Sequence, residues 1–203
     1  MENKANKSIP DQHSGSEMDV IEERILPDLT ASKHLFKEAY HRMLSVNSWG
    51  DYSHGTKFTL FDAEHKPAKR EARSGDFIRI DIPGPGPISG DGFDWVHVES
   101  VEFTEDNSNA ECIAMQVRPC QNPFGQKADV AHFLKKEATS TFVVRRNGLH
   151  VCAEEHGRNE MANISSEKIL DDARNFIVGI AAKLGFSYPQ WKMLVKGLLD
   201  GKN

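Results

Sequence analysis

The chain has 203 residues, of which 38% are hydrophobic and 27% charged, and its net charge of −5 makes it mildly acidic. This balance is typical of a globular domain with a substantial core. A nucleic-acid-binding protein normally carries a basic stripe, whereas the densest basic run here, residues 66–73, alternates with acidic and small residues. No apolar run reaches the length of a membrane span, so we expect neither nucleic-acid nor membrane partners.

The N-terminal residues are polar and show no hydrophobic periodicity, which predicts a disordered tail over 1–18 followed by a single domain over 19–203. They also lack the apolar segment of a signal peptide. The cysteines Cys112, Cys120 and Cys152 are odd in number and form no C-x-x-C pair. This usage favours a reduced, cytoplasmic setting over a disulfide framework or a zinc site.

The first predicted element is a helix over residues 31–46, with Thr30 as its N-cap. Its apolar residues recur with a period of 3.6 and form one stripe: Leu35, Phe36, Ala39, Tyr40, Met43 and Leu44. His34, Glu38 and His41 share another face and could offer metal ligands. No fourth ligand is spaced to join them, so we interpret this face as solvated and expect no metal.

From residue 57 onward the period changes to two, which predicts strands; Ile78, Ile80 and Ile82 share one face. The stretch IPGPGPISGDG, residues 82–92, then raises the question of a phosphate-binding loop. Its G-x-G-x-x-x-G spacing is one residue longer than the dinucleotide fingerprint, and its inner prolines remove backbone donors. We therefore interpret it as a stiff connection between strands and expect no cofactor.

The sequence STFVVRRNGLHVCAEEH, residues 140–156, predicts a β-hairpin. Asn147-Gly148 is typical of a two-residue type I′ turn, which requires a positive φ at both residues. That turn would pair Val144 with Val151 on the core face. The opposite face then carries Thr139, Thr141, Val143, Arg145, His150, Cys152, Glu154 and His156.

Two helices are predicted after the strands. The first has an apolar stripe from Ile169 to Leu184, and we expect it to pack against the sheet isoleucines. The second, over 188–199, presents Trp191, Leu194, Val195 and Leu198 on one face. This order predicts an α+β fold, with a curved antiparallel sheet of about six strands packed by an N-terminal helix and two C-terminal helices.

The element order resembles that of the START/Bet v1 helix-grip superfamily, in which a curved antiparallel sheet grips a long C-terminal helix. The stretch SKHLFKEAYHRMLSVNSWGDYS, residues 32–53, is similar to the helix that runs into an aromatic-rich turn in those proteins. The resemblance implies that residues 169–184 form the gripped helix. The superfamily usually opens with a strand, and none is predicted here.

The leading hypothesis is a non-catalytic domain that binds a small apolar or aromatic ligand between the sheet and the C-terminal helix, as a monomer or homodimer. The residues expected to contact this ligand are Trp49, Trp95, Thr139, Thr141, Glu154 and His156.

Two alternatives stay open. One is a protein-interaction module whose exposed aromatic residues are Trp49, Tyr52, Phe93 and Trp95. The other is a hydrolase-like enzyme that uses His156 and Glu154 as acid and base, or Cys152 as a nucleophile with His150 or His156. Same-side neighbours on a strand lie ~6–7 Å apart, which is long for a thiol–imidazole pair, so packing is the better interpretation of Cys152.

Overall fold

A single antiparallel sheet of seven strands organises the chain, with the strand order β1-β7-β6-β5-β4-β3-β2. The computed structural model describes residues 8–53, 55–82, 90–106, 109–126, 129–163 and 188–201. The strands are β1 (Ser16–Ile25), β2 (Lys57–Phe61), β3 (Phe77–Asp81), β4 (Asp94–Asp106), β5 (Ala110–Pro119), β6 (Thr139–Asn147) and β7 (His150–Glu160).

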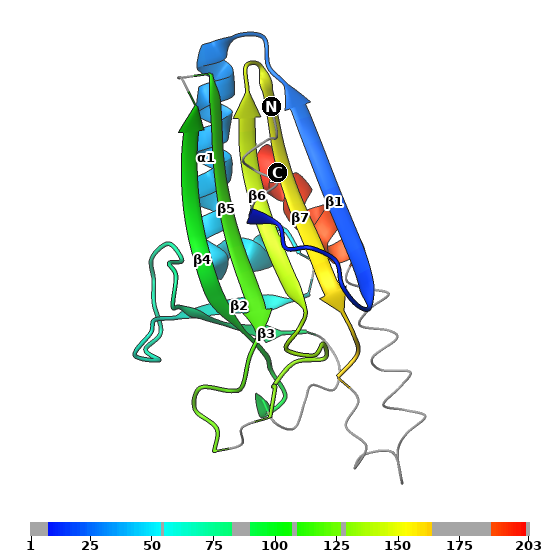
Figure 1. Cartoon of the computed structure of the whole chain (residues 1–203). Helices are drawn as coiled ribbons and strands as arrows, with labels where there is room; N and C mark the ends of the chain where they lie inside the picture. Colours follow the sequence, from blue (N-terminus) through cyan, green and yellow to red (C-terminus); the bar gives the residue numbers. More distant parts are fainter. Residues whose placement is uncertain are drawn as a thin grey trace.

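The helices lie against one face of this sheet (Figure 1). They are α1 (Leu29–Leu44), the 3-10 helix η2 (Val46–Asp51) and a C-terminal helix over 188–200. We call the face that they cover the inner face and the opposite one the outer face. The predicted α+β class and the antiparallel sheet are confirmed, with seven strands instead of about six. None of the helices in the described residues is long and apolar enough to cross a membrane.

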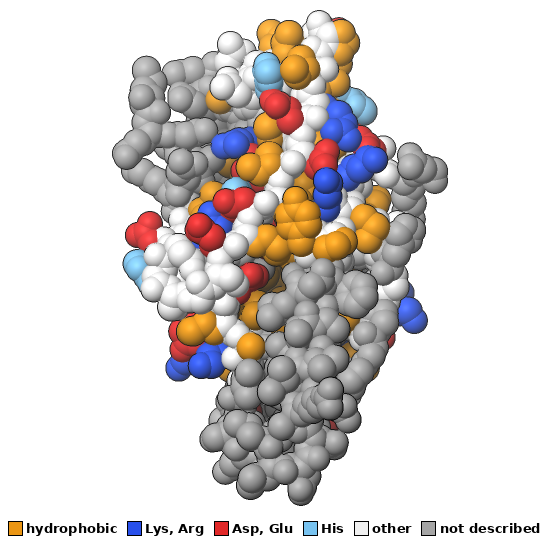
Figure 2. All heavy atoms as spheres, turned by 90° about the vertical axis from the view of Figure 1, so that its right-hand side faces the viewer, with side chains coloured by type: hydrophobic (Ala, Val, Ile, Leu, Met, Phe, Trp, Pro, Cys, Tyr) orange, Lys and Arg blue, Asp and Glu red, His pale blue; other side chains and the backbone are white. Residues whose placement is uncertain are grey.

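The extra strand is β1, which sequence analysis missed. It pairs only with β7, so it forms one edge of the sheet. Val20 is its one buried hydrophobic residue, and charged side chains occupy much of the rest. Charges are common on edge strands because they discourage pairing with other chains, and they hid the period-two pattern. Viewed onto this edge, acidic, basic and apolar side chains are mixed (Figure 2).

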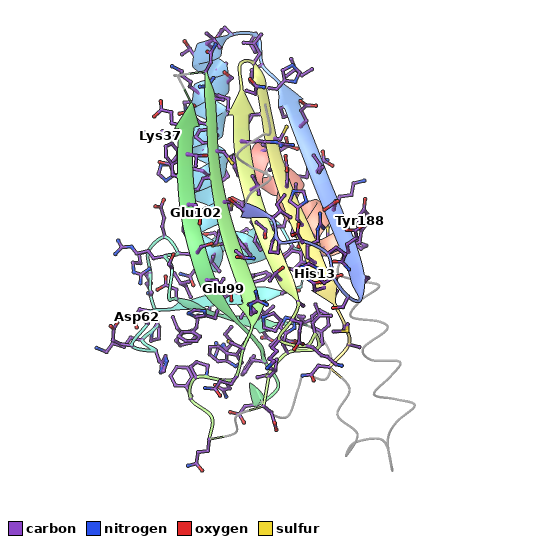
Figure 3. The ribbon with its side chains drawn as sticks, viewed as in Figure 1. His13, Lys37, Asp62, Glu99, Glu102 and Tyr188 are labelled. Atoms are coloured by element: carbon purple, nitrogen blue, oxygen red, sulfur yellow. The ribbon has the colours of Figure 1, made fainter. Side chains whose placement is uncertain are left out.

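The predicted disordered tail over 1–18 was wrong at its C-terminal end, because residues 16–18 already belong to β1. Residues 8–15 contact the sheet as well. Ser8 donates a hydrogen bond to Glu102 of β4 at 3.3 Å, and the backbone N–H of His13 donates to the Asn159 side chain at 2.7 Å. These two contacts place the segment across the outer face (Figure 3).

Helix α1 begins two residues earlier than predicted, and Asp28 is its N-cap instead of Thr30. The Asp28 backbone is extended, and its carboxylate accepts a hydrogen bond from the Ala31 N–H at 2.8 Å. Thr30 is already helical and cannot serve as the cap. The predicted apolar stripe is confirmed, since its members are buried or packed against the core.

The β6–β7 hairpin has the predicted faces but a different register. Asn147 pairs with His150 and Val144 with Ala153, so the turn residues are Gly148 and Leu149. Gly148 has a φ of 60°, whereas Asn147 does not adopt a positive φ. A positive φ at the first central residue alone is typical of a type II′ turn. Partners are displaced by two positions, which leaves the side chains on the predicted faces.

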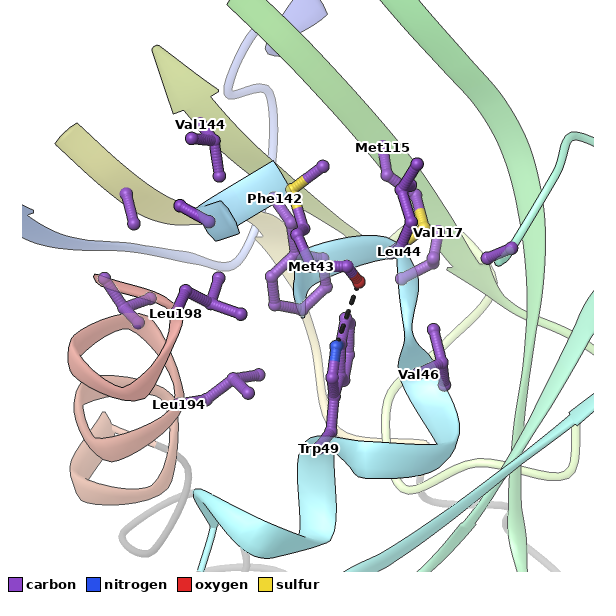
Figure 4. Packing of buried hydrophobic residues seen from close by; sticks show 14 of the residues in the cluster. Met43, Leu44, Val46, Trp49, Met115, Val117, Phe142, Val144, Leu194 and Leu198 are labelled. Carbon is purple, nitrogen blue, oxygen red and sulfur yellow. Dashed lines mark hydrogen bonds between the residues drawn. The ribbon is translucent and has the colours of Figure 1, made fainter. Parts of the chain in front are cut away.

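The C-terminal helix over 188–200 fills the inner face. Its predicted apolar face is confirmed: Leu194, Val195 and Leu198 are fully buried, and Trp191 packs against the core. Leu194 and Leu198 point from this helix into the buried cluster that also contains Phe142 of β6 and Trp49 of η2 (Figure 4). The other predicted helix, residues 169–184, lies outside the described residues, as do residues 83–89 of the proline- and glycine-rich loop.

Candidate functional site: a cavity on the inner face

A cavity lies on the inner face between the sheet and the C-terminal helix. Its apolar wall includes Trp49, Ile78, Ile80, Val96, Phe142 and Trp191. The polar groups that join them are His132, Ser140, Glu160 and Gln190. Apolar walls with a few polar groups are typical of small-molecule sites.

The cavity is narrow in this structure. The space free of protein atoms amounts to about 710 Å³, part of which is open to solvent. The volume within which the centre of a water molecule fits is only about 50 Å³. One water requires ~10–15 Å³ by the same measure, so there is room for a few waters. A ligand the size of a benzene ring therefore requires side chains of the wall to move.

Aromatic rings form one end of this wall. The Phe142 ring centroid lies 4.7 Å from that of Trp49 and 5.4 Å from that of Trp191. The Trp49 indole N–H donates to the Met43 carbonyl oxygen at 3.0 Å (Figure 4). Because this donor is already used, the Trp49 ring contributes an apolar surface to the cavity.

Glu155 of β7 is the unexpected residue on the inner face. It lies opposite Phe142 of β6 and Val20 of β1, on the same side of the strand as Ala153. Its side chain is fully buried, and neither carboxylate oxygen has a hydrogen-bond partner among the described residues. Burial raises the pKa of Glu155 well above its ordinary value, and the charge of Glu160 acts in the same direction. The nearby Ser140 hydroxyl opposes this shift.

Glu160 brings a second carboxyl group to the same region. Asn159, with a φ of 56°, precedes it and departs from strand geometry. The Glu160 Oε1 atom would lie 2.7 Å from a Cβ atom at Gly157, so its carboxylate occupies the space above this glycine. Gly157 follows Glu155 on the same face of β7. Burial raises the pKa of Glu160, although Ser16 and Arg158 act against it.

The outer face of the same strands carries a chain of ion pairs. Glu154 contacts Arg145 Nε at 2.5 Å and His156 Nε2 at 2.8 Å, and Asp19 contacts His156 Nδ1 at 2.6 Å and Arg158 at 2.8 Å. Burial lowers the pKa of His156, but hydrogen bonds to Glu154 and Asp19 outweigh burial and raise it. This network joins β6, β7 and β1.

The residues expected to contact a ligand are therefore not gathered in one place. Trp49 lines the cavity, whereas Thr139, Thr141, Glu154 and His156 lie on the outer face. Strand alternation places Trp95 on the side of β4 opposite Val96, in a separate aromatic cluster with Phe61, Phe77 and Phe93.

The two alternative functions lose their main residues. Trp49 and Trp95 are each only 2% exposed, so they cannot form the exposed aromatic surface of an interaction module. Burial raises the pKa of Cys152, as do the charges of Glu23 and Glu154, which is the reverse of an activated thiol. Both ring nitrogens of His156 contact carboxylates, so neither is available as a base.

The other two cysteines are no more reactive. Burial raises the pKa of Cys112 to about 11 and that of Cys120 to about 12. Within the described ranges, no group of three or more histidine, cysteine or acidic residues is placed to hold a metal. His41, one of the three residues considered as ligands on the first helix, contacts Glu71 at 2.5 Å.

No protein-family model matches the chain, and no curated protein matches its sequence. Similar solved structures include a START superfamily protein from Mycobacterium smegmatis, with 9% identity, a TM-score of 0.39, and coverage of 91% of this chain and 99% of that one. Major latex-like protein 151 from Panax ginseng has 10% identity, a TM-score of 0.33, and coverage of 84% and 96%. Norcoclaurine synthase from Thalictrum flavum has 10% identity, a TM-score of 0.36, and coverage of 94% and 91%. Such distant likeness concerns the fold alone and says nothing about a ligand or a reaction.

Proposed function

We propose that the protein binds a small, mostly apolar molecule in the cavity between the sheet and the C-terminal helix. The observation that carries this proposal is the composition of the wall. Aromatic and branched aliphatic side chains from the sheet, from η2 and from the C-terminal helix converge there, together with only four polar side chains. Such a wall gains free energy by removing apolar ligand surface from water.

Binding without catalysis suits the reactive groups of the described chain. The thiols have raised pKa values, and the one histidine of the hairpin that was considered as a base is held between two carboxylates on the outer face. His132 at the cavity wall accepts a hydrogen bond from the Leu134 N–H through Nδ1 at 3.0 Å, so this nitrogen is already engaged by the backbone.

The proposal is tested by ligand-induced stabilisation. A ligand that binds only the folded chain raises the free energy of unfolding by ~2.7 kcal/mol at a concentration of 100 Kd. We expect benzyl alcohol, a small neutral aromatic probe, to raise the Tm of the full chain and to change its tryptophan fluorescence, because Trp49 and Trp191 line the cavity.

Two matched variants locate the binding site. Gln190→Phe places a ring at the cavity wall, and Lys192→Phe places the same ring on the exposed side of the same helix. Gln190→Phe should lose the response to benzyl alcohol, whereas Lys192→Phe should keep it. An unchanged response in Gln190→Phe, or no response in the wild-type chain, would overturn the proposal.

A further inference from the structure

We propose that the cavity selects ligands carrying a protonated amine, which Glu160 contacts at the wall with Glu155 buried beside it. This inference rests on the proposed function and names the class of ligand. It starts from position: Glu160 lines the cavity, its carboxylate occupies the space above Gly157, and Glu155 precedes that glycine on the same face. Two carboxyl groups thus lie on one side of an apolar space.

The buried cation that β6 places on the inner face, Arg146, lies at the far end of the strand from Ser140 and pairs with Glu111 at 2.6 Å. The described wall contains no lysine or arginine. Arg158 is the nearest cationic residue along the strand, but its side chain forms ion pairs with Asp19 and Glu17 from β1. His132 also lies on the wall, where its Nδ1 accepts a hydrogen bond from the Leu134 N–H. A positive charge brought by a ligand would therefore meet no lysine or arginine on the described wall.

Glu155 makes the strongest case. Buried carboxyl groups are normally hydrogen-bonded or ion-paired, since an unpaired one weakens the fold. Here neither carboxylate oxygen of a fully buried glutamate meets hydrogen-bond geometry, although the Ser140 hydroxyl lies close enough to favour the ionised form. Residues that conflict with their surroundings in the folded chain are typical of functional sites. An ammonium group, with three N–H donors, would supply a charged hydrogen-bond partner at Glu160, beside the buried Glu155.

Three probes of nearly equal size and different charge test this inference. They are benzylamine, which is protonated at neutral pH, benzyl alcohol, which is neutral, and benzoate, which is an anion. We expect the wild-type chain to bind benzylamine on the order of tenfold more tightly than benzyl alcohol, because hydrogen bonds between charged groups are stronger than neutral ones. Benzoate should bind more weakly than either, because the Glu160 carboxylate at the wall repels it.

The variant Glu160→Gln keeps the shape of the side chain and removes its charge. It should lose the tenfold preference for benzylamine while it retains the affinity for benzyl alcohol, which also shows that the cavity is intact. The same substitution at the exposed Glu105 of β4 is the control and should change neither affinity.

The outcomes separate the two proposals. Equal affinities for benzylamine and benzyl alcohol in the wild-type chain, or an undiminished preference in Glu160→Gln, would overturn the amine selectivity and leave the apolar binding function standing. If none of the three probes binds, both proposals fail.

Discussion

Replacing Glu155 with glutamine is expected to stabilise the protein at neutral pH. The side chain is fully buried without a hydrogen-bond partner among the described residues, and burial raises its pKa well above the ordinary value of 4.5. The folded chain therefore holds a proton that the unfolded chain releases. Stability is fully present below pH 4.5 and is lost as the pH rises towards the folded pKa. Glutamine resembles the protonated acid in shape and does not titrate.

The size of the effect follows from this linkage. Stability falls by about 1.4 kcal/mol for each pH unit between the unfolded and folded pKa values. The 2.5 pH units between 4.5 and 7 therefore limit the loss due to one carboxyl group to at most about 3.4 kcal/mol at pH 7. We expect Glu155→Gln to gain about 1–3 kcal/mol at pH 7, or roughly 3–10 °C in Tm for a chain of this size. At pH 5 the gain should fall below about 1 kcal/mol.

Urea unfolding of the wild type, Glu155→Gln and the control Glu105→Gln at pH 5, 6 and 7 measures this difference. The pH dependence of the variant should be reduced and not abolished, because burial also raises the pKa of Glu160. If Glu155→Gln is less stable than the wild type at pH 7, or gains the same amount at pH 5 and pH 7, the carboxyl group is ionised and paired, and the reasoning fails.

Three further predictions concern the fold. His156 faces Asp19 and Glu154 within a network that includes Arg145 and Arg158, and its pKa is raised. The protonated imidazole therefore stabilises the wild type below pH 6.5, and this stabilisation is lost as the pH rises through the raised pKa. His156→Gln should remove it, which a series of unfolding curves at different pH values checks. Asp28→Ala should cost about 1 kcal/mol in urea unfolding through the lost N-cap, and Thr30→Ala less than half of that. Leu198→Ala should cost about 2–5 kcal/mol by the same assay, because loss of the fully buried side chain leaves a cavity in the core cluster that includes Phe142 and Trp49. A cost below about 1 kcal/mol would show that the C-terminal helix does not complete the core.

Much of the fold could be predicted because hydrophobic periodicity reports directly on burial. The stripe of α1 and the inner face of β6 and β7 are buried as the sequence indicates. The hairpin register could not be predicted, because contacts distant in sequence determine the turn. The Gly148 N–H donates to the Asn109 carbonyl oxygen, the Leu26 N–H to that of Leu149, and the Ser32 hydroxyl to that of Gly148. An Asn-Gly pair indicates a turn, but tertiary contacts decide which residues occupy its centre.

The candidate site was harder to predict than the fold. The polar residues chosen from the sequence were those that share a face in β6 and β7, and this face proved to be the outer one. The useful signal in the sequence was an acidic residue among the apolar residues of the other face. Glu155 continues the series Val151 and Ala153 with a carboxylate. Glu160 carries no such signal, because its position depends on the departure from strand geometry at Asn159.

Glu154 and Glu155 are adjacent glutamates that are both buried, with exposures of 2% and 0%. Glu154 faces outward and has Arg145 and His156 as partners. Glu155 faces inward and has no hydrogen-bond partner within the described chain. Both glutamates are buried, so burial does not explain why only Glu154 has charged partners. The fold places the cations Arg145 and His156 beside Glu154. On the inner side, the cation of β6, Arg146, pairs with Glu111 instead, and the cavity lies on this same face. The absence of a hydrogen-bond partner at Glu155 therefore agrees with the proposal that a ligand brings a cation to the neighbouring Glu160.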